Sequence, residues 1–123
     1  MSTTLETIIA VKNVPLSAEF YRSLFALKSE HGGETFEILK NENHIVLCLH
    51  KWGEHDHPTM ISSDKGIGNG LILFFRVTDL NRILGNAYKL MANIEQEIHY
   101  NKNSLKNQFI LRDPDGYYII VSE

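Results

Sequence analysis

One stretch of the chain decides its fold: Phe109-Ile-Leu-Arg-Asp-Pro-Asp-Gly-Tyr-Tyr-Ile-Ile-Val-Ser-Glu123. Two apolar runs flank a central Asp-Pro-Asp-Gly. Pro114 fixes φ and removes a backbone donor, and Asp115-Gly116 supplies the residues that tight turns favour. The stretch therefore predicts a strand, a turn and a second strand. Asp113 and Asp115 are expected to make turn hydrogen bonds and not to act as a catalytic pair.

A second feature is that the chain contains one pattern twice. Apolar strands are predicted over 5–12 and 71–77, and each is followed by an N-cap residue, Asn13 or Asp79. Apolar residues at three- and four-residue spacing then predict an amphipathic helix in each half. These residues are Leu16, Phe20, Leu24 and Leu27 in the first half, and Leu80, Ile83, Leu84, Ala87 and Met91 in the second. Aligning Val11 with Val77 also brings Asn13 onto Asp79.

The later part of each half repeats as well. Ile-Leu-Lys-Asn-Glu-Asn at 38–43 corresponds to Ile-Leu-Arg-Asp-Pro-Asp at 110–115, so that Ile38 aligns with Ile110. The strand directly after each helix, near 28–31 and near 96–100, has the weakest signal. Each half therefore predicts the order β-α-β-β-β.

The length of 123 residues suits one domain with a hydrophobic core. We expect residues 1–123 to form a single domain of two repeats, about 4–51 and 70–123, joined by a linker over 52–69 that is rich in turn-forming residues. Twelve basic and fifteen acidic residues give a formal net charge of −3. Because Lys and Arg are not clustered, this composition argues against a nucleic-acid-binding surface.

The cellular compartment is predicted from three features. Cys48 is the sole cysteine and lies in an apolar run, so no intrachain disulfide can form and a reducing compartment is favoured. The first residues lack the charged and apolar regions of a signal peptide. No apolar run approaches the roughly 20 residues that span a bilayer. We therefore expect a cytoplasmic protein that binds no membrane.

This β-α-β-β-β duplication resembles the vicinal oxygen chelate superfamily of glyoxalases, bleomycin-resistance proteins and extradiol dioxygenases. The resemblance spans almost the whole chain. Its most specific pieces are Val11-Lys-Asn-Val with Phe20-Tyr21, the stretch from Leu47 to Trp52-Gly53, and Arg112-Asp-Pro-Asp-Gly-Tyr. The resemblance implies an α+β fold in which two βαβββ modules form curled mixed sheets around a cleft. It also implies a homodimer.

The resemblance further implies where a metal ion would bind, because the superfamily takes one ligand from the first and last strand of each half. Counted from the motifs above, these positions are Glu6, Leu47, Ile72 and Ile120. Three of them are aliphatic, and one carboxylate alone does not make a metal site. We therefore predict no metal and no cofactor at these positions.

The neighbours of these positions are expected to line the cleft, because strand side chains alternate between two faces. A mostly apolar lining with a few polar groups is typical of a small-molecule pocket, although the same residues could pack a filled core. Trp52 is added as an indole that could stack on a planar ligand. The predicted ligand-binding residues are Glu6, Ile8, Leu47, Leu49, Trp52, Ile72, Phe74, Arg76, Tyr118 and Ile120.

Glu6 is the one carboxylate of this set and allows three interpretations. It could anchor a ligand, pair with Arg76, or act as a general base while Arg76 or Tyr118 stabilises developing charge. The anchor and the ion pair are favoured over catalysis.

A histidine cluster is the other candidate for chemistry. His50, His55 and His57 fall within eight residues, with Asp56 between the last two. Imidazoles bind zinc and nickel. A solvated loop is the plainer interpretation, because no cysteine or fixed scaffold accompanies these side chains.

These observations favour a metal-free small-molecule-binding protein of the glyoxalase and bleomycin-resistance type, which sequesters a drug or metabolite and catalyses no reaction. One alternative is a lyase or isomerase that uses Glu6 as its base or has unusual metal ligands. Another is a non-catalytic partner subunit. The mild negative charge together with Arg76 argues against a strongly cationic ligand.

Overall fold

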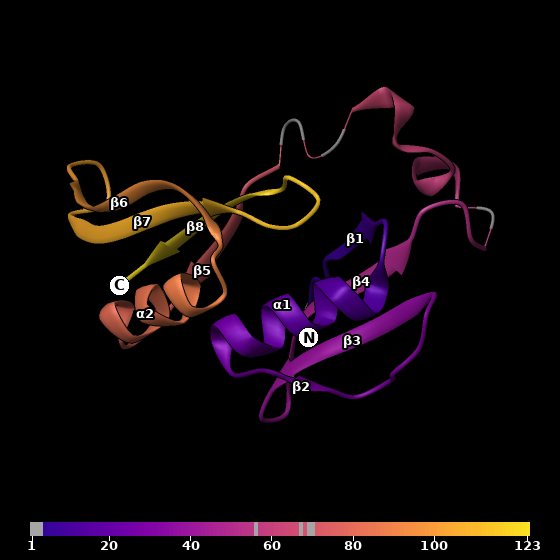
Figure 1. The fold of residues 1–123 in the computed structure, drawn as a ribbon, viewed down its shortest axis with the longest axis horizontal. Coiled ribbons are helices and arrows are strands. Elements are labelled where there is room, and N and C mark those ends of the chain that lie inside the picture. The colour runs from indigo at the N-terminus through magenta and orange to yellow at the C-terminus, as the bar shows by residue number, and fades with distance from the viewer. Residues whose placement is uncertain (1–3, 56, 67, 69–70) are drawn as a thin grey trace. The chain divides into compact units, whose positions relative to one another are not determined.

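The computed structural model describes residues 4–55, 57–66, 68 and 71–123. The chain folds into two compact units, Met1–Lys65 (unit 1) and Gly66–Glu123 (unit 2). Each unit has the order β-α-β-β-β (Figure 1). The predicted α+β fold with two βαβββ modules is therefore confirmed.

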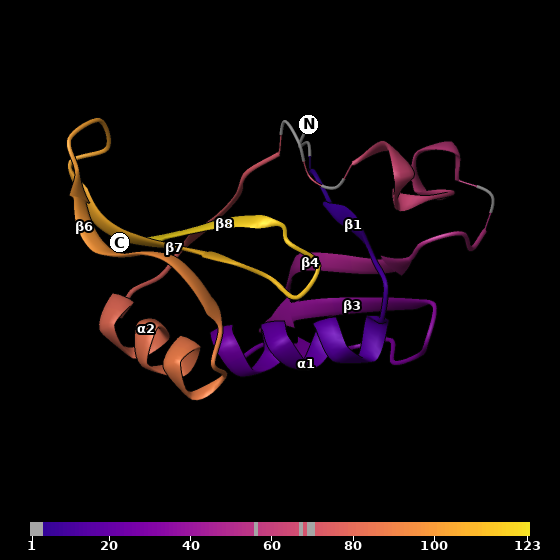
Figure 2. The ribbon, with the colours of Figure 1, turned by 45° about the horizontal axis from the view of Figure 1, so that its top comes forward.

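Unit 1 is a four-stranded mixed sheet with one helix. The strand order is β1-β4-β3-β2, in which β1 runs parallel to β4 and the other neighbours are antiparallel. Helix α1 lies against one face of this sheet (Figure 2). The elements are β1 (Ile8–Val11), α1 (Val14–Phe25), β2 (Lys28–Ser29), β3 (Phe36–Asn41), β4 (His44–Lys51) and the 3₁₀ turns η1 (Pro58–Met60) and η2 (Ser63–Lys65).

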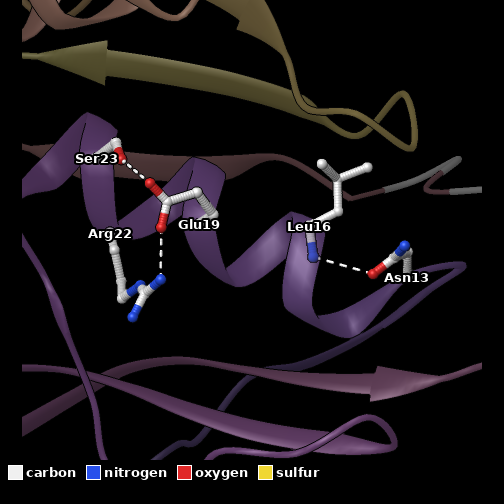
Figure 3. Close-up of polar contacts among 5 residues, drawn as sticks. All are labelled: Asn13, Leu16, Glu19, Arg22 and Ser23. Atoms are coloured by element: carbon white, nitrogen blue, oxygen red, sulfur yellow. Dashed lines mark hydrogen bonds and ion pairs between the residues drawn. The ribbon is translucent and has the colours of Figure 1, made fainter.

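Helix α1 begins and ends where its flanking residues dictate. The Leu16 backbone N–H donates to Asn13 Oδ1 at 3.0 Å (Figure 3), as an N-cap requires. Ala26 adopts a left-handed conformation with φ of 56° and ends the helix. Leu16 is 57% exposed, so its expected place on the buried face is wrong. The buried face instead starts at Val14 and continues through Ala18, Tyr21 and Leu24.

Unit 2 repeats this plan with the strand order β5-β8-β7-β6. Its helix begins at Asp79, whose Oδ1 accepts from the Arg82 backbone N–H at 3.1 Å. The helix ends before Met91, which is 91% exposed and does not belong to the buried face predicted for it. The elements are β5 (Leu73–Arg76), α2 (Leu80–Lys89), β6 (Asn93–Asn101), β7 (Lys106–Arg112) and β8 (Tyr118–Ser122).

The closing hairpin joins β7 to β8 as the sequence predicts. Asp113 Oδ1 accepts the backbone N–H groups of Asp115 and Tyr117, both at 2.9 Å. Gly116 has φ of 95°, in the left-handed region that glycine adopts readily. The hairpin therefore uses Asp113 for the turn.

In the part of the chain that the structure describes, no helix is both long enough and apolar enough to cross a bilayer.

Candidate functional site

The two faces of the unit 1 sheet are set by its strand register. Ile8 pairs with Cys48 and Ile9 with Leu49, while Leu39 pairs with Leu47. Leu39, Leu47 and Leu49 are at most 1% exposed, and together with the buried face of α1 they form the core of unit 1. The opposite face, called the open face below, carries Ile8, Ala10, Cys48, His50 and Phe36.

A pocket of about 540 Å³ lies on the open face of unit 1. Ile8 and Phe36 supply apolar surface, and four imidazoles supply nitrogen atoms. A second cavity of about 200 Å³ shares Ile8, His50 and His57 with it. The lining residues of the larger pocket are Ile8, His31, Thr35, Phe36, His50, His55 and His57.

His50 is the most buried polar residue of this pocket, with 4% of its surface exposed. It lies in β4, between Ala10 of β1 and Phe36 of β3. Its Nδ1 lies 2.8 Å from the Lys51 carbonyl oxygen. Because a carbonyl only accepts, Nδ1 carries the proton and donates. Nε2 is buried and has no hydrogen-bond partner, which is unusual for a polar atom inside a protein.

The loop after β4 brings two further imidazoles to His50. The Gly53 backbone N–H donates to the Met60 carbonyl at 2.6 Å and closes this loop. The ring of His50 lies 5.2 Å from that of His55 and 5.0 Å from that of His57, between centroids. The rings of His55 and His57 in the predicted cluster therefore both lie next to the buried ring of His50.

A buried carboxylate, which does not itself line the pocket, positions the segment that carries His31. Glu37 is 4% exposed, and its Oε1 accepts the backbone N–H groups of His31, Gly32 and Ile38 at 2.8–2.9 Å. These bonds fix the segment between β2 and β3. The ring of His31 then packs edge-on against Phe36 at 5.3 Å. Glu37 is thus a positioning residue that inspection of the sequence did not single out.

The chain was compared with protein families, with curated proteins and with solved structures. No family model matches the chain. Glyoxalase I from Saccharomyces cerevisiae is 26% identical over 136 residues, which cover 94% of this chain and 41% of that protein. The chain thus spans about two fifths of the length of this curated relative.

Solved structures agree in fold. Lactoylglutathione lyase from Agrobacterium tumefaciens has a TM-score of 0.74 at 21% identity, covering 100% of this chain and 94% of that chain. A glyoxalase/bleomycin resistance protein/dioxygenase family enzyme from Burkholderia phytofirmans PsJN has a TM-score of 0.79 at 13% identity, covering 95% and 94%. These likenesses show that the chain has the glyoxalase/bleomycin-resistance fold. An integron cassette protein from Vibrio cholerae also shares this fold, with a TM-score of 0.72 at 21% identity over 99% and 96% of the two chains.

The internal repeat corrects one of the metal positions that the resemblance implies for this chain. The alignment of Ile38 with Ile110, which relates the two closing hairpins, places Ile120 on Cys48 and not on Leu47. The structure agrees, because Cys48 pairs with Ile8 and Ile120 pairs with Phe74, the counterpart of Ile8. The equivalent position in unit 1 is therefore Cys48.

The corrected positions still do not fit the superfamily's metal. Burial raises the pKa of the Cys48 thiol, and the nearby carboxylate of Glu6 raises it further, so the thiolate that a metal requires is disfavoured. In unit 2 the positions are Ile72 and Ile120, which have no donor atom. Two side chains with donor atoms fall short of the three protein ligands of a catalytic zinc site.

The other predicted site residues of unit 1 are distributed unevenly. Ile8 lines the pocket, whereas Leu47 and Leu49 lie in the core. Glu6 is exposed and close to Cys48, so it lacks the burial that the general-base interpretation requires. Trp52 is half-buried and its Nε1 has no partner, but it is not among the described residues that line the two cavities. Asp56 lies outside the described residues.

The predicted residues of unit 2 share one face of its sheet. Phe74 is 43% exposed, and the Arg76 guanidinium lies over its ring at 5.1 Å. Arg76 Nη1 also donates to the Glu123 carbonyl at 3.1 Å. Tyr118 carries the Arg112 guanidinium over its ring at 4.9 Å. An ion pair between Glu6 and Arg76 would join the two units and stays a prediction.

Proposed function

We propose that this protein binds a small, partly planar organic molecule in the open-face pocket of unit 1, and that it acts by binding without the superfamily's metal chemistry. The observation that carries the proposal is the pocket itself. It combines apolar and aromatic walls with a buried histidine whose Nε2 has no partner. Small-molecule sites share this composition, in which a few polar groups orient a largely apolar ligand.

The walls favour a flat ligand. Phe36 packs edge-on against His31 at 5.3 Å and lies 6.3 Å from His50, again nearly edge-on. Because aromatic pairs prefer offset or edge-to-face arrangements, a planar ligand ring would pack favourably against Phe36. Ile8 is 44% exposed and contributes to both cavities, so its side chain is available to a ligand.

A thermal-shift screen tests the proposal. Aromatic and antibiotic-like compounds are added to the protein in a buffer that contains EDTA, so that metal ions do not contribute. A compound that binds only the folded state raises the melting temperature by mass action. We expect at least one such compound, with no product formed on long incubation.

The chain offers a matched pair of variants for this screen. Ile8 lines the pocket, whereas Ile45 has a similar exposure of 38% in the same sheet but lines neither cavity. We expect Ile8→Ser to abolish the ligand-induced shift and Ile45→Ser to retain it. Equal shifts in the two variants would contradict the proposed site.

A homodimer, which the superfamily resemblance implies, is proposed as the assembly. Light scattering at micromolar concentration measures it directly. A measured mass equal to that of one chain would contradict it.

A further inference from the structure

We propose that His50, His55 and His57 bind a divalent transition-metal ion such as Zn²⁺ or Ni²⁺ in the unit 1 pocket. This site is separate from the superfamily positions at Glu6 and Cys48. It shares the pocket and the unpartnered His50 Nε2 with the organic ligand proposed above, but it requires His55 and His57 and does not require the apolar walls.

His50 is prepared to be the first ligand. Metal-binding imidazoles usually donate the N–H of one ring nitrogen to a carbonyl or carboxylate, which fixes the tautomer and directs the other nitrogen to the metal. His50 has this arrangement, because Nδ1 donates to the Lys51 carbonyl at 2.8 Å and Nε2 has no partner. The backbone of His50 is fixed in the sheet, because β4 pairs with β1 at Ala10 and with β3 at Phe36.

The spacing of the three rings suits a common ion. With a Zn–N distance of about 2.0–2.1 Å and tetrahedral angles, the centroids of two coordinated imidazoles lie roughly 5 Å apart. The centroids of His55 and His57 lie 5.2 Å and 5.0 Å from that of His50. Both distances match this value.

One ring must move to complete the site. The centroids of His55 and His57 are 6.5 Å apart, so these rings have to approach each other by roughly 1 Å. Consistent with this, no group of three ligating side chains in the described residues is already arranged around one point. Both side chains are exposed and lie on the loop after β4, where rotation about χ1 and χ2 is least hindered.

The loop already places both imidazoles beside His50. His55 has φ of 64°, in the left-handed region that a non-glycine residue occupies at a cost. The bond from Gly53 N–H to the Met60 carbonyl closes the loop, so that the backbone keeps both residues near His50 while their side chains rotate. Three neutral nitrogen ligands leave a fourth position of the ion open to water or to an oxygen donor of a ligand.

Calorimetric titration of untagged protein with ZnCl₂ or NiCl₂ alone tests the site. We expect one ion per chain, and we expect the double variant His55→Gln/His57→Gln to weaken binding by at least tenfold. This variant changes only exposed loop side chains, so its circular dichroism should match that of the unaltered protein. His44→Gln, an exposed histidine at the start of β4, is the matched control and should bind as the unaltered protein does.

A spectroscopic readout is independent of affinity. Co²⁺ bound by three imidazoles in tetrahedral geometry gives an intense visible absorption that octahedral aqueous Co²⁺ lacks. We expect this band in the unaltered protein and in His44→Gln, and its loss in the double variant. No ion bound at the stoichiometric point, or equal affinity in the double variant and the control, would overturn the site. Either result leaves the EDTA-buffered ligand screen unaffected.

Discussion

The open face of unit 1 has a counterpart in unit 2, the sheet face of Phe74, Ile120, Ser122 and Gln108, which is called the open face of unit 2 below. Equivalent positions on these two faces carry different side chains. The alignment of Ile38 with Ile110 places Phe36 and His50 of unit 1 on Gln108 and Ser122 of unit 2, and each pair is also a cross-strand pair in its own sheet. In unit 1 the pair borders a pocket and leaves His50 Nε2 without a partner.

The unit 2 pair satisfies its own polar groups. Gln108 Oε1 accepts from Asn101 at 3.0 Å, Gln108 Nε2 lies 3.1 Å from His99 Nε2, and the Ser122 hydroxyl donates to the Glu123 carbonyl at 3.2 Å. A polar network whose members bond one another stabilises a fold, whereas an unpaired buried atom is available to a ligand. The two units thus share one backbone plan, whereas this pair of positions borders a pocket in unit 1 and a hydrogen-bonded network in unit 2.

The largest expected effect separates the core face of unit 1 from its open face. Leu49 is fully buried beneath α1. Leu49→Ala should lower the free energy of unfolding by about 2–5 kcal/mol, because it removes buried methyl groups and leaves a cavity. Ile8→Ala, at an exposed position, should cost well under half as much. Urea denaturation measures both, and similar costs for the two variants would show that the faces have been assigned wrongly.

A second variant turns the unit 1 site into its unit 2 counterpart. His50→Ser places on β4 the residue that β8 carries at Ser122. We expect Zn²⁺ affinity to fall by at least tenfold, since the anchored imidazole is gone, while His44→Ser leaves it unchanged. Unfolding curves for both variants accompany the calorimetry, and retained affinity in a folded His50→Ser protein would break the comparison.

The unit 2 network has its own test. Gln108 is 4% exposed, and Gln108→Met keeps its length while removing both hydrogen bonds. The loss should be about 1–3 kcal/mol, because partner groups lose their bonds in a buried setting. Gln96→Met, at an exposed position in β6, is the matched control and should change stability by less than about 0.5 kcal/mol. Equal costs would mean that the network does not stabilise unit 2.

The smallest effect lies on the surface of α1. A hydrogen bond from the Ser23 hydroxyl, and then the Arg22 guanidinium, hold the pKa of Glu19 below its usual value (Figure 3). A lowered folded-state pKa contributes stability above the unfolded value of 4.5, and this contribution is lost as the pH falls. Glu19→Gln should therefore lower the melting temperature slightly at pH 7 and less at pH 3.5. Glu42→Gln serves as the control, and a larger effect at the lower pH would contradict this sign.

Much of the fold could be predicted from local chemistry. Asn13 and Asp79 cap their helices, and Asp113 forms its turn, because each side chain bonds backbone groups within four residues. The strand β6 was harder, since its nine residues carry few apolar side chains and it is stabilised by pairing with β7. Such pairing is a tertiary effect that a local pattern does not contain.

The site was predicted less completely, for reasons of register. Residues 45–49 are all apolar, so alternation gives no sign of which of them face α1, and an error of one residue exchanges the two faces. Counting from Trp52 chose Leu47, whereas the internal repeat chooses Cys48. The pairing of Phe36 with His50 across β3 and β4 likewise depends on strand register, which local alternation does not contain.

The most direct test of a functional asymmetry between the two open faces is an amide NMR titration with an aromatic fragment library in buffer that contains EDTA. We predict that binding fragments shift the resonances of residues 31–36 and of Cys48 and His50, and leave those of Phe74, Gln108 and Ser122 in place. Shifts centred on Phe74, Gln108 and Ser122, or no binding from the whole library, would contradict the account.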